Sequence, residues 1–160
     1  MQNILYTRVS TGNQGSQSLE AQNQICLNFL NSNGITLTAS FQEIGSAYSG
    51  NQSVLKYVID TYKNTNLYVL NVSRFSRNIL VGVELLKKAT TNNINVHFIE
   101  EQLSSMNKTH AHQIRVKLSE SQHESEIISN RINNINNILS DKGWQFGVAE
   151  YGKKSDKIDG

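Results

Sequence analysis

Over the first 109 residues, short apolar runs alternate with longer segments that show helical periodicity. The apolar runs have the length of β-strands. They lie at 3–6, 35–41, 67–72 and 94–99. The segments between them repeat apolar residues every three or four positions, as amphipathic helices do. They lie at 18–31, 53–63 and 79–90. Strands that alternate with helices predict an α/β three-layer sandwich with a mainly parallel sheet of four to five strands.

The same pattern predicts which helix faces are buried. The second helix is expected to begin with Ser53 as its N-cap, because a serine side chain can satisfy an unpaired amide there. Its inward residues are expected to be Val54, Leu55, Val58 and Ile59. The third helix is expected to face the sheet through Ile79, Val83, Leu86 and Thr90. Residues 43–52 are polar and small, and they predict a loop.

The last third of the chain has a different pattern, with one uninterrupted helix expected from about residue 110 to 142. About 30 residues of helix span about 45 Å, which exceeds the width of a domain of this size. We therefore expect its far end to pack on another subunit, on a ligand, or on both. A helix that merely rests on its own sheet would explain the first half only. The stripe consists of Ile114, Leu118, Ser121, Ser125, Ile128, Ile132, Ile135 and Leu139.

Three regions follow from these patterns. Residues 1–109 are predicted to form an α/β core, and residues 110–142 a long helix for oligomerisation. Residues 143–160 contain glycine and several lysines, and they are expected to form a linker or tail.

Composition narrows the class of protein. The net charge of +2 is close to neutral, so any basic site has to be local. Cys26 is the one cysteine, which excludes an internal disulfide and a zinc site built from cysteines. Its apolar neighbours favour a core thiol over a reactive one. The sequence shows no leader peptide and no apolar run of about 20 residues, so a soluble, intracellular protein is expected.

The candidate chemistry lies where two predicted strands end. Arg8 and Ser10 are two residues apart at the end of the first strand, so both side chains point to the same side. Arg74 and Arg77 follow the third strand. The carboxyl ends of parallel strands meet at one edge of the sheet, where α/β proteins build their sites. Gln22 is a polar residue on the inner face of the first helix, within reach of this edge.

Three guanidiniums beside one serine predict a site that handles phosphate, because arginine binds phosphate oxygens in bidentate fashion and stays charged. No histidine lies near the predicted strand ends, and no G-x-S-x-G turn, P-loop or metal-ligand spacing is present. Phosphoryl transfer to Ser10 without a metal or other cofactor is the reading this set favours. The alternative is that each arginine is an independent surface cation.

These motifs resemble a known family. Residues 6–11 and 17–22, followed by the arginine pair in residues 73–78, resemble the signatures of the serine recombinases, the resolvase/invertase superfamily. Residues 98–101 and the long helix also fit the N-terminal catalytic domain of that family. The resemblance covers about residues 3–147.

The resemblance implies an enzyme, a site-specific DNA recombinase that cuts and rejoins DNA. Ser10 would attack a DNA phosphodiester and form a 5′-phosphoserine intermediate, while Arg8, Arg74 and Arg77 would hold the scissile phosphate. No metal or cofactor would be required. The residues implied in substrate binding are Gln17, Gln22 and Arg131.

The resemblance also implies partners. The substrate would be double-stranded DNA, and the long helix would form a homodimer and lie across the DNA. Two dimers would join in a tetramer that is active in strand exchange. The tail from residue 143 looks like the junction after which such proteins carry a DNA-binding domain.

Four positions depart from the family pattern. Ser73 replaces an aspartate, and Gln52 and Ser53 replace an arginine and a proline. Asn130 replaces a glutamate on the long helix. A catalytically impaired module that still dimerises and binds DNA is therefore the alternative function. An unrelated flavodoxin-like protein that binds a phosphorylated small molecule is the third reading.

Overall fold

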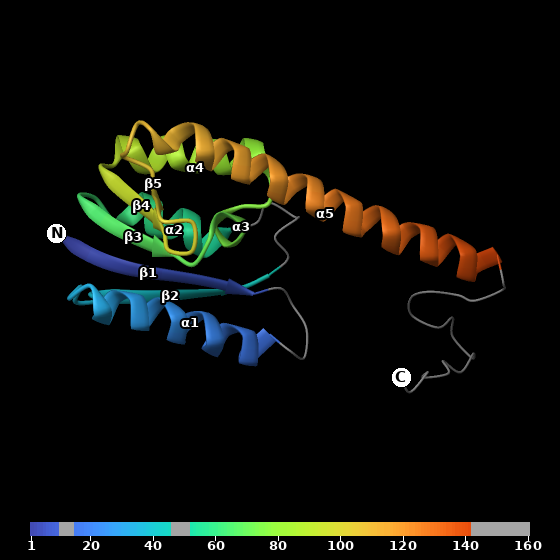
Figure 1. The fold of residues 1–160 in the computed structure, drawn as a ribbon, viewed down its shortest axis with the longest axis horizontal. Coiled ribbons are helices and arrows are strands. Elements are labelled where there is room, and N and C mark those ends of the chain that lie inside the picture. The colour runs from blue at the N-terminus through green and yellow to red at the C-terminus, as the bar shows by residue number, and fades with distance from the viewer. Residues whose placement is uncertain (10–14, 46–51, 142–160) are drawn as a thin grey trace. The chain divides into compact units, whose positions relative to one another are not determined.

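The computed structural model describes residues 1–9, 15–45 and 52–141, except the side chains of residues 15–18 and 141. Its strands are β1 (Gln2–Val9), β2 (Ala39–Ile44), β3 (Thr65–Val69), β4 (Ile94–Phe98) and β5 (Leu103–Ser104). Its helices are α1 (Gly15–Ser32), α2 (Ser53–Thr61), α3 (Val72–Phe75), α4 (Ile79–Thr91) and α5 (His110–Asp141). Figure 1 shows their arrangement.

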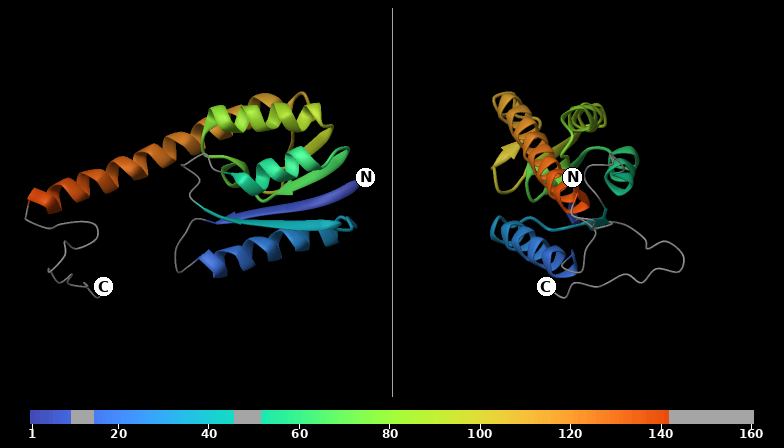
Figure 2. Two further views of the ribbon diagram at one scale, coloured as in Figure 1. Left: turned by 180° about the vertical axis from the view of Figure 1, so that it is seen from behind. Right: turned by 90° about the vertical axis from the view of Figure 1, so that its right-hand side faces the viewer.

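The strands form one sheet in the order β2-β1-β3-β4-β5. The first four strands are parallel, and β5 pairs with β4 in the antiparallel direction. Helix α1 covers one face of the sheet, and α2 and α4 cover the other (Figures 1 and 2). The three-layer α/β fold with a mainly parallel sheet is therefore confirmed.

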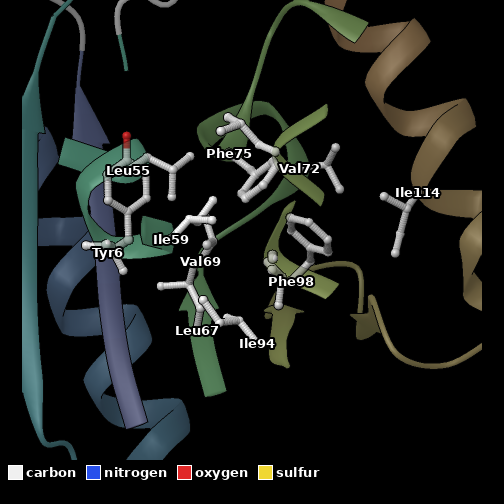
Figure 3. Packing of buried hydrophobic residues seen from close by; sticks show 14 of the residues in the cluster. Tyr6, Leu55, Ile59, Leu67, Val69, Val72, Phe75, Ile94, Phe98 and Ile114 are labelled. Atoms are coloured by element: carbon white, nitrogen blue, oxygen red, sulfur yellow. The ribbon is translucent and has the colours of Figure 1, made fainter. Parts of the chain in front are cut away.

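The core consists of two clusters, because side chains alternate between the faces of a strand. Along β1, Ile4 and Tyr6 point toward α2 and α4, where Figure 3 shows the larger cluster. Leu5 points the other way and packs with Cys26 and Leu30 of α1. Burial raises the pKa of the Cys26 thiol to about 11, so the thiol is protonated at neutral pH. The prediction of a core thiol is confirmed.

The order of the strands decides where the ends of β1 and β3 meet. The chain leaves β1 to form β2 on one side and then returns to place β3 on the other side of β1. Open α/β sheets bind ligands at such a reversal, beyond the carboxyl ends of the strands. Arg8 lies near the end of β1, and Arg74 and Arg77 follow β3.

Several predicted strand boundaries were wrong. β1 continues to Val9, and β3 runs from Thr65 to Val69 and not from residue 67 to 72. Residues 35–38 are not in a strand. Ile35 and Leu37 pack against the cluster under α1. The alternating pattern of apolar residues in this segment therefore reflects the burial of side chains in the connection between α1 and β2. Pairing of β2 with β1 starts at Ala39 and continues to Ile44. Glu43 is consequently a strand residue and not the start of a loop. Residues 46–51 of the predicted loop lie outside the described residues.

The inner face of α2 is confirmed, because Leu55, Val58 and Ile59 are buried and Val54 packs partly against the core. The predicted cap was wrong. Gln52 occupies the N-cap position without a side-chain bond to the helix, and Ser53 is the first helical residue.

The predicted inner face of α4 was also wrong in part. Gly82, Leu85 and Ala89 are its buried residues, whereas Val83 is 39% exposed. Small residues at 82 and 89 allow close approach of neighbouring elements, a signal that a count of large apolar residues misses. Ile79 and Leu86 pack only partly against the core.

The long helix was predicted correctly as α5, which covers 32 residues. Residues 1–123 and 124–160 are separate compact units, so α5 spans the boundary between them. In the first unit, Ile114 and Leu118 of the stripe are buried. In the second unit, Ile128, Ile132 and Ile135 are about half exposed, at 47%, 52% and 55%. In the described part of the chain, no helix combines the length and apolar character needed to cross a membrane.

Contact between α4 and α5 predicts an interaction between two substitutions. A Cβ atom at Gly82 would lie 2.7 Å from Cδ2 of the fully buried Leu118. Leu118→Ala should lower the free energy of unfolding by about 2–5 kcal/mol. Gly82→Ala should gain at most about 1 kcal/mol in helix propensity, and overpacking of about 1–3 kcal/mol should offset it. In the Leu118→Ala background, the stability gain from Gly82→Ala should reappear. Urea unfolding of the natural chain, the two single variants and the double variant can measure it. An equal effect of Gly82→Ala in both backgrounds would contradict this contact.

Candidate functional site

The site is organised around a buried guanidinium. Arg8 lies one residue before the end of β1, is 2% exposed, and donates from Nη2 to the carbonyl oxygen of Ser73 at 2.8 Å. Its Nη1 has no hydrogen-bond partner among the described residues. Burial lowers the pKa of Arg8; Tyr6 opposes this effect, and the nearby charges of Arg77 and Arg74 reinforce it. An open donor in a cationic neighbourhood is suited to an anion.

The segment after β3, predicted as a loop, begins with the short helix α3. Asn71 is the N-cap, and its Oδ1 accepts a hydrogen bond from the Arg74 amide at 3.0 Å. Glu101, from the segment between β4 and β5, accepts from the Val72 amide at 3.1 Å. These two side chains satisfy amides that have no partner within the helix. The four residues of α3 therefore depend on contacts with the rest of the fold.

Arg74 lies in α3 and Arg77 follows it, and both side chains are half-buried. Burial lowers the pKa of Arg74, and the charge of Arg77 lowers it further, whereas Glu100 raises it. Nε of Arg74 is buried without a partner in the described part of the chain. Neither of the two salt bridges among the described residues involves Arg8, Arg74 or Arg77. The structure thus brings the three predicted arginines together, with donors still available.

The buried carboxylate of Glu43 on β2 binds the elements that surround the site. Glu43 is paired with Arg8 in the strand register and accepts a hydrogen bond from the Tyr6 hydroxyl on Oε2. Its Oε1 accepts from the Val54 amide at 3.2 Å, and the Ser53 hydroxyl lies 3.5 Å away. Burial and the bond to Glu43 raise the pKa of Tyr6. Glu43 therefore joins β1, β2 and the first turn of α2.

The positions that depart from the family pattern have contacts of their own. Gln52 is 1% exposed and donates from Nε2 to the carbonyl oxygen of Phe75 at 2.7 Å. The Ser73 hydroxyl donates to Oδ1 of Asn71 at 2.8 Å, beside the carbonyl that Arg8 binds. Asn130 is exposed in the second unit of the chain.

The other predicted site residues lie in α1, in α5 or outside the described residues. Ser10 lies outside the described residues, and Gln17 lies in α1 with a side chain that is likewise not described. Gln22 is 4% exposed on the face of α1 that carries the buried Leu19 and Cys26. Arg131 is exposed on α5 in the second unit.

Sequence reasoning missed four supporting residues, namely Glu43, Gln52, Asn71 and Glu101. Asn71 carried a recognisable signal, because an asparagine three residues before Arg74 is a common N-cap. The other three contact groups that are 10–37 positions away in the sequence. Nothing local in the sequence marks such contacts.

The comparisons with known proteins agree with this geometry. The sequence profile of the family described as "Resolvase, N terminal domain" matches residues 3–140. A search of curated proteins returned no significant match.

Among solved structures, one similar chain is the N-terminal catalytic domain of TP901-1 integrase, with a TM-score of 0.58 and 19% identity over 79% of this chain and 98% of that one. A resolvase family site-specific recombinase from Streptococcus pneumoniae gives a TM-score of 0.55 and 24% identity over 90% and 99% of the two chains. The C-terminal catalytic domain of ISC1926 TnpA, an IS607-like serine recombinase, gives 0.53 and 15% identity over 62% and 69%.

At these identities the solved structures establish the shared fold, and the family profile establishes descent. The fold, the clustered arginines and the profile match over residues 3–140 lead to one conclusion: the chain belongs to the resolvase family of serine recombinases and carries its N-terminal catalytic domain.

Proposed function

We propose that this domain catalyses site-specific recombination of double-stranded DNA, with Ser10 as the nucleophile. The observation that carries the proposal is the cluster of Arg8, Arg74 and Arg77 at the carboxyl ends of β1 and β3. Three guanidiniums that form no salt bridge with a described residue need a counter-charge, and a DNA phosphodiester supplies one. Ser10 is two residues beyond Arg8 in the chain, and we propose that it attacks a phosphate bound by the arginines.

The reaction exchanges one phosphate ester for another. The Ser10 hydroxyl loses its proton, its oxygen forms a bond to phosphorus, and the bond between phosphorus and the 3′ oxygen breaks. That oxygen takes up a proton and leaves as a 3′-hydroxyl, while the 5′ phosphate remains attached to Ser10. Attack on the phosphoserine by a 3′-hydroxyl then rejoins DNA and restores the serine. The number of phosphate ester bonds is conserved, so the cycle consumes no nucleotide or other cofactor.

The arginines have distinct tasks in this scheme. They bind the phosphate and stabilise the negative charge that develops on it during attack, which removes the need for a metal ion. Arg8 is fixed by burial, whereas Arg74 and Arg77 are half-buried and can meet the substrate. Gln17 on α1 and Arg131 on α5 are proposed to bind the DNA substrate, and the buried Gln22 is proposed to support the site.

We also propose that the segments of the chain have separate roles. Residues 1–109 carry the chemistry, and the helix of residues 110–142 joins two copies in a dimer, two of which form the active tetramer. Exposed isoleucines in the second unit supply the apolar surface for this contact.

A covalent-capture experiment tests the nucleophile. The chain should form a covalent protein–DNA adduct with a suicide substrate, a duplex nicked so that the cleaved strand cannot be rejoined. Ser10→Ala should abolish the adduct, because no other group can form the phosphoserine bond. The control, Ser32→Ala, changes an exposed serine at the end of α1 and should leave adduct formation unchanged. Adduct in the Ser10→Ala variant would refute the assignment.

The same assay tests the arginines. Arg8→Ala, Arg74→Ala and Arg77→Ala should each slow adduct formation by about a hundredfold or more, the scale seen when one donor to a developing charge is lost. An unchanged rate for any one of them would remove that residue from the site. A natural chain that dimerises and binds DNA but never forms adduct would identify the catalytically impaired module.

The dimer prediction concerns the exposed isoleucines of α5. Replacing Ile128 and Ile135 together by aspartate should weaken the dimer by about a hundredfold or more, because each buried isoleucine contributes about 1.5–3 kcal/mol and an aspartate must be desolvated. Sedimentation equilibrium measures this change. The matched control places aspartate at Asn130 and Asn137, which are exposed on the opposite side of the helix, and should leave the dimer intact. A monomeric natural chain, or equal loss in both variants, would exclude this stripe as the interface.

A further inference from the structure

Helix α3 ends in carbonyl groups that the helix itself cannot satisfy. The last carbonyls of any helix have no amide one turn ahead to bind them. Here the carbonyl of Ser73 accepts from Arg8, and the carbonyl of Phe75 accepts from Gln52. One donor comes from β1 and the other from the start of α2. Two side chains from different elements therefore fix the peptide group before Arg74 and the peptide group after Phe75.

The Gln52 side chain is available for this contact because another residue caps the start of α2. Gln52 occupies the N-cap position of α2, where a side chain commonly accepts a hydrogen bond from an amide of the first turn. Its side chain makes no such bond. The Glu43 carboxylate binds the Val54 amide instead, at 3.2 Å. Glu43 thus satisfies the helix end, and the amide of Gln52 reaches the Phe75 carbonyl.

Phe75 is the residue through which this contact acts on the arginines. Its ring is fully buried and packs edge-on against Phe98, with the ring centroids 5.6 Å apart (Figure 3). Its carbonyl is held by Gln52. Phe75 lies between Arg74 and Arg77 in the chain, so its two anchors restrict the backbone that carries both side chains.

The charge of residue 52 also matters. Arg8, Arg74 and Arg77 already repel one another, and a fourth buried cation would add to this repulsion. An amide donates the same kind of hydrogen bond without adding charge. The Nε2 bond from Gln52 to the Phe75 carbonyl is therefore a neutral contact beside the arginine cluster.

We propose that Gln52 is a positioning residue, which holds Arg74 and Arg77 in place through its bond to the Phe75 carbonyl. The neutral amide of Gln52 anchors the backbone segment that carries both arginines. The inference rests on the proposed function for its effect on the rate. Its structural part concerns only the order of α3.

The first test separates DNA cleavage from DNA binding. Gln52→Met and Gln52→Glu keep the approximate size of the side chain but cannot donate to a carbonyl. Each should slow single-turnover adduct formation by about 10- to 100-fold, while the dissociation constant for the DNA changes by no more than about twofold. Gln24→Met, at an exposed position of α1, is the matched control and should have no effect.

The second test needs no activity. The Ser76 amide donates to the Val72 carbonyl at 3.0 Å and so reports whether α3 is formed. Its hydrogen exchange should be about tenfold faster or more in Gln52→Met and Gln52→Glu, and unchanged in Gln24→Met. If the natural chain forms no adduct but exchange accelerates, the proposed function fails and the anchor stands. Unchanged exchange at Ser76, or an unchanged rate in an active chain, would overturn the positioning role.

Discussion

The hydrogen bond from the buried Arg8 guanidinium to the Ser73 carbonyl is the contact on which the site depends. A buried charge is costly unless it is paired or hydrogen-bonded. Arg8 meets this requirement with a backbone carbonyl and leaves Nη1 without a partner in the described structure. Because β1 and β3 are adjacent and parallel, the end of β1 reaches the first residues after β3. The sheet order is therefore what permits the contact.

The neighbouring groups explain why the arginine segment holds a defined shape although α3 has only four residues. Asn71 and Glu101 satisfy amides at its start, and Arg8 and Gln52 bind carbonyls near its end. The segment is thus held by side chains from several elements, while the guanidiniums of Arg74 and Arg77 form no salt bridge within the part of the chain that the structure describes. A catalytic site benefits from this arrangement, because donors that are fixed in advance need no reorganisation during the reaction.

The apolar stripe of α5 is buried in the first unit and exposed in the second. Within the first unit, Ile114 and Leu118 complete the core beside α4, and the close contact at Gly82 depends on the absence of a Cβ atom. Within the second unit, isoleucines of the same stripe remain exposed. One apolar stripe thus serves burial within the domain at one end and offers an apolar surface at the other. This second role accords with the oligomeric assembly proposed for the domain.

The sequence by itself determined the fold class, the long helix and the arginine set, because each leaves a local or periodic trace. Alternating apolar runs and amphipathic segments specify a parallel α/β sheet, and Arg8, Arg74 and Arg77 stand at predictable strand ends. Tertiary structure alone decided the supporting contacts. Gln52 and Glu43 act on groups brought close only by the strand order, and Gly82 faces α5 only because of how the two helices pack. Periodicity records which side of an element is buried, but it carries no information about which distant group that side meets.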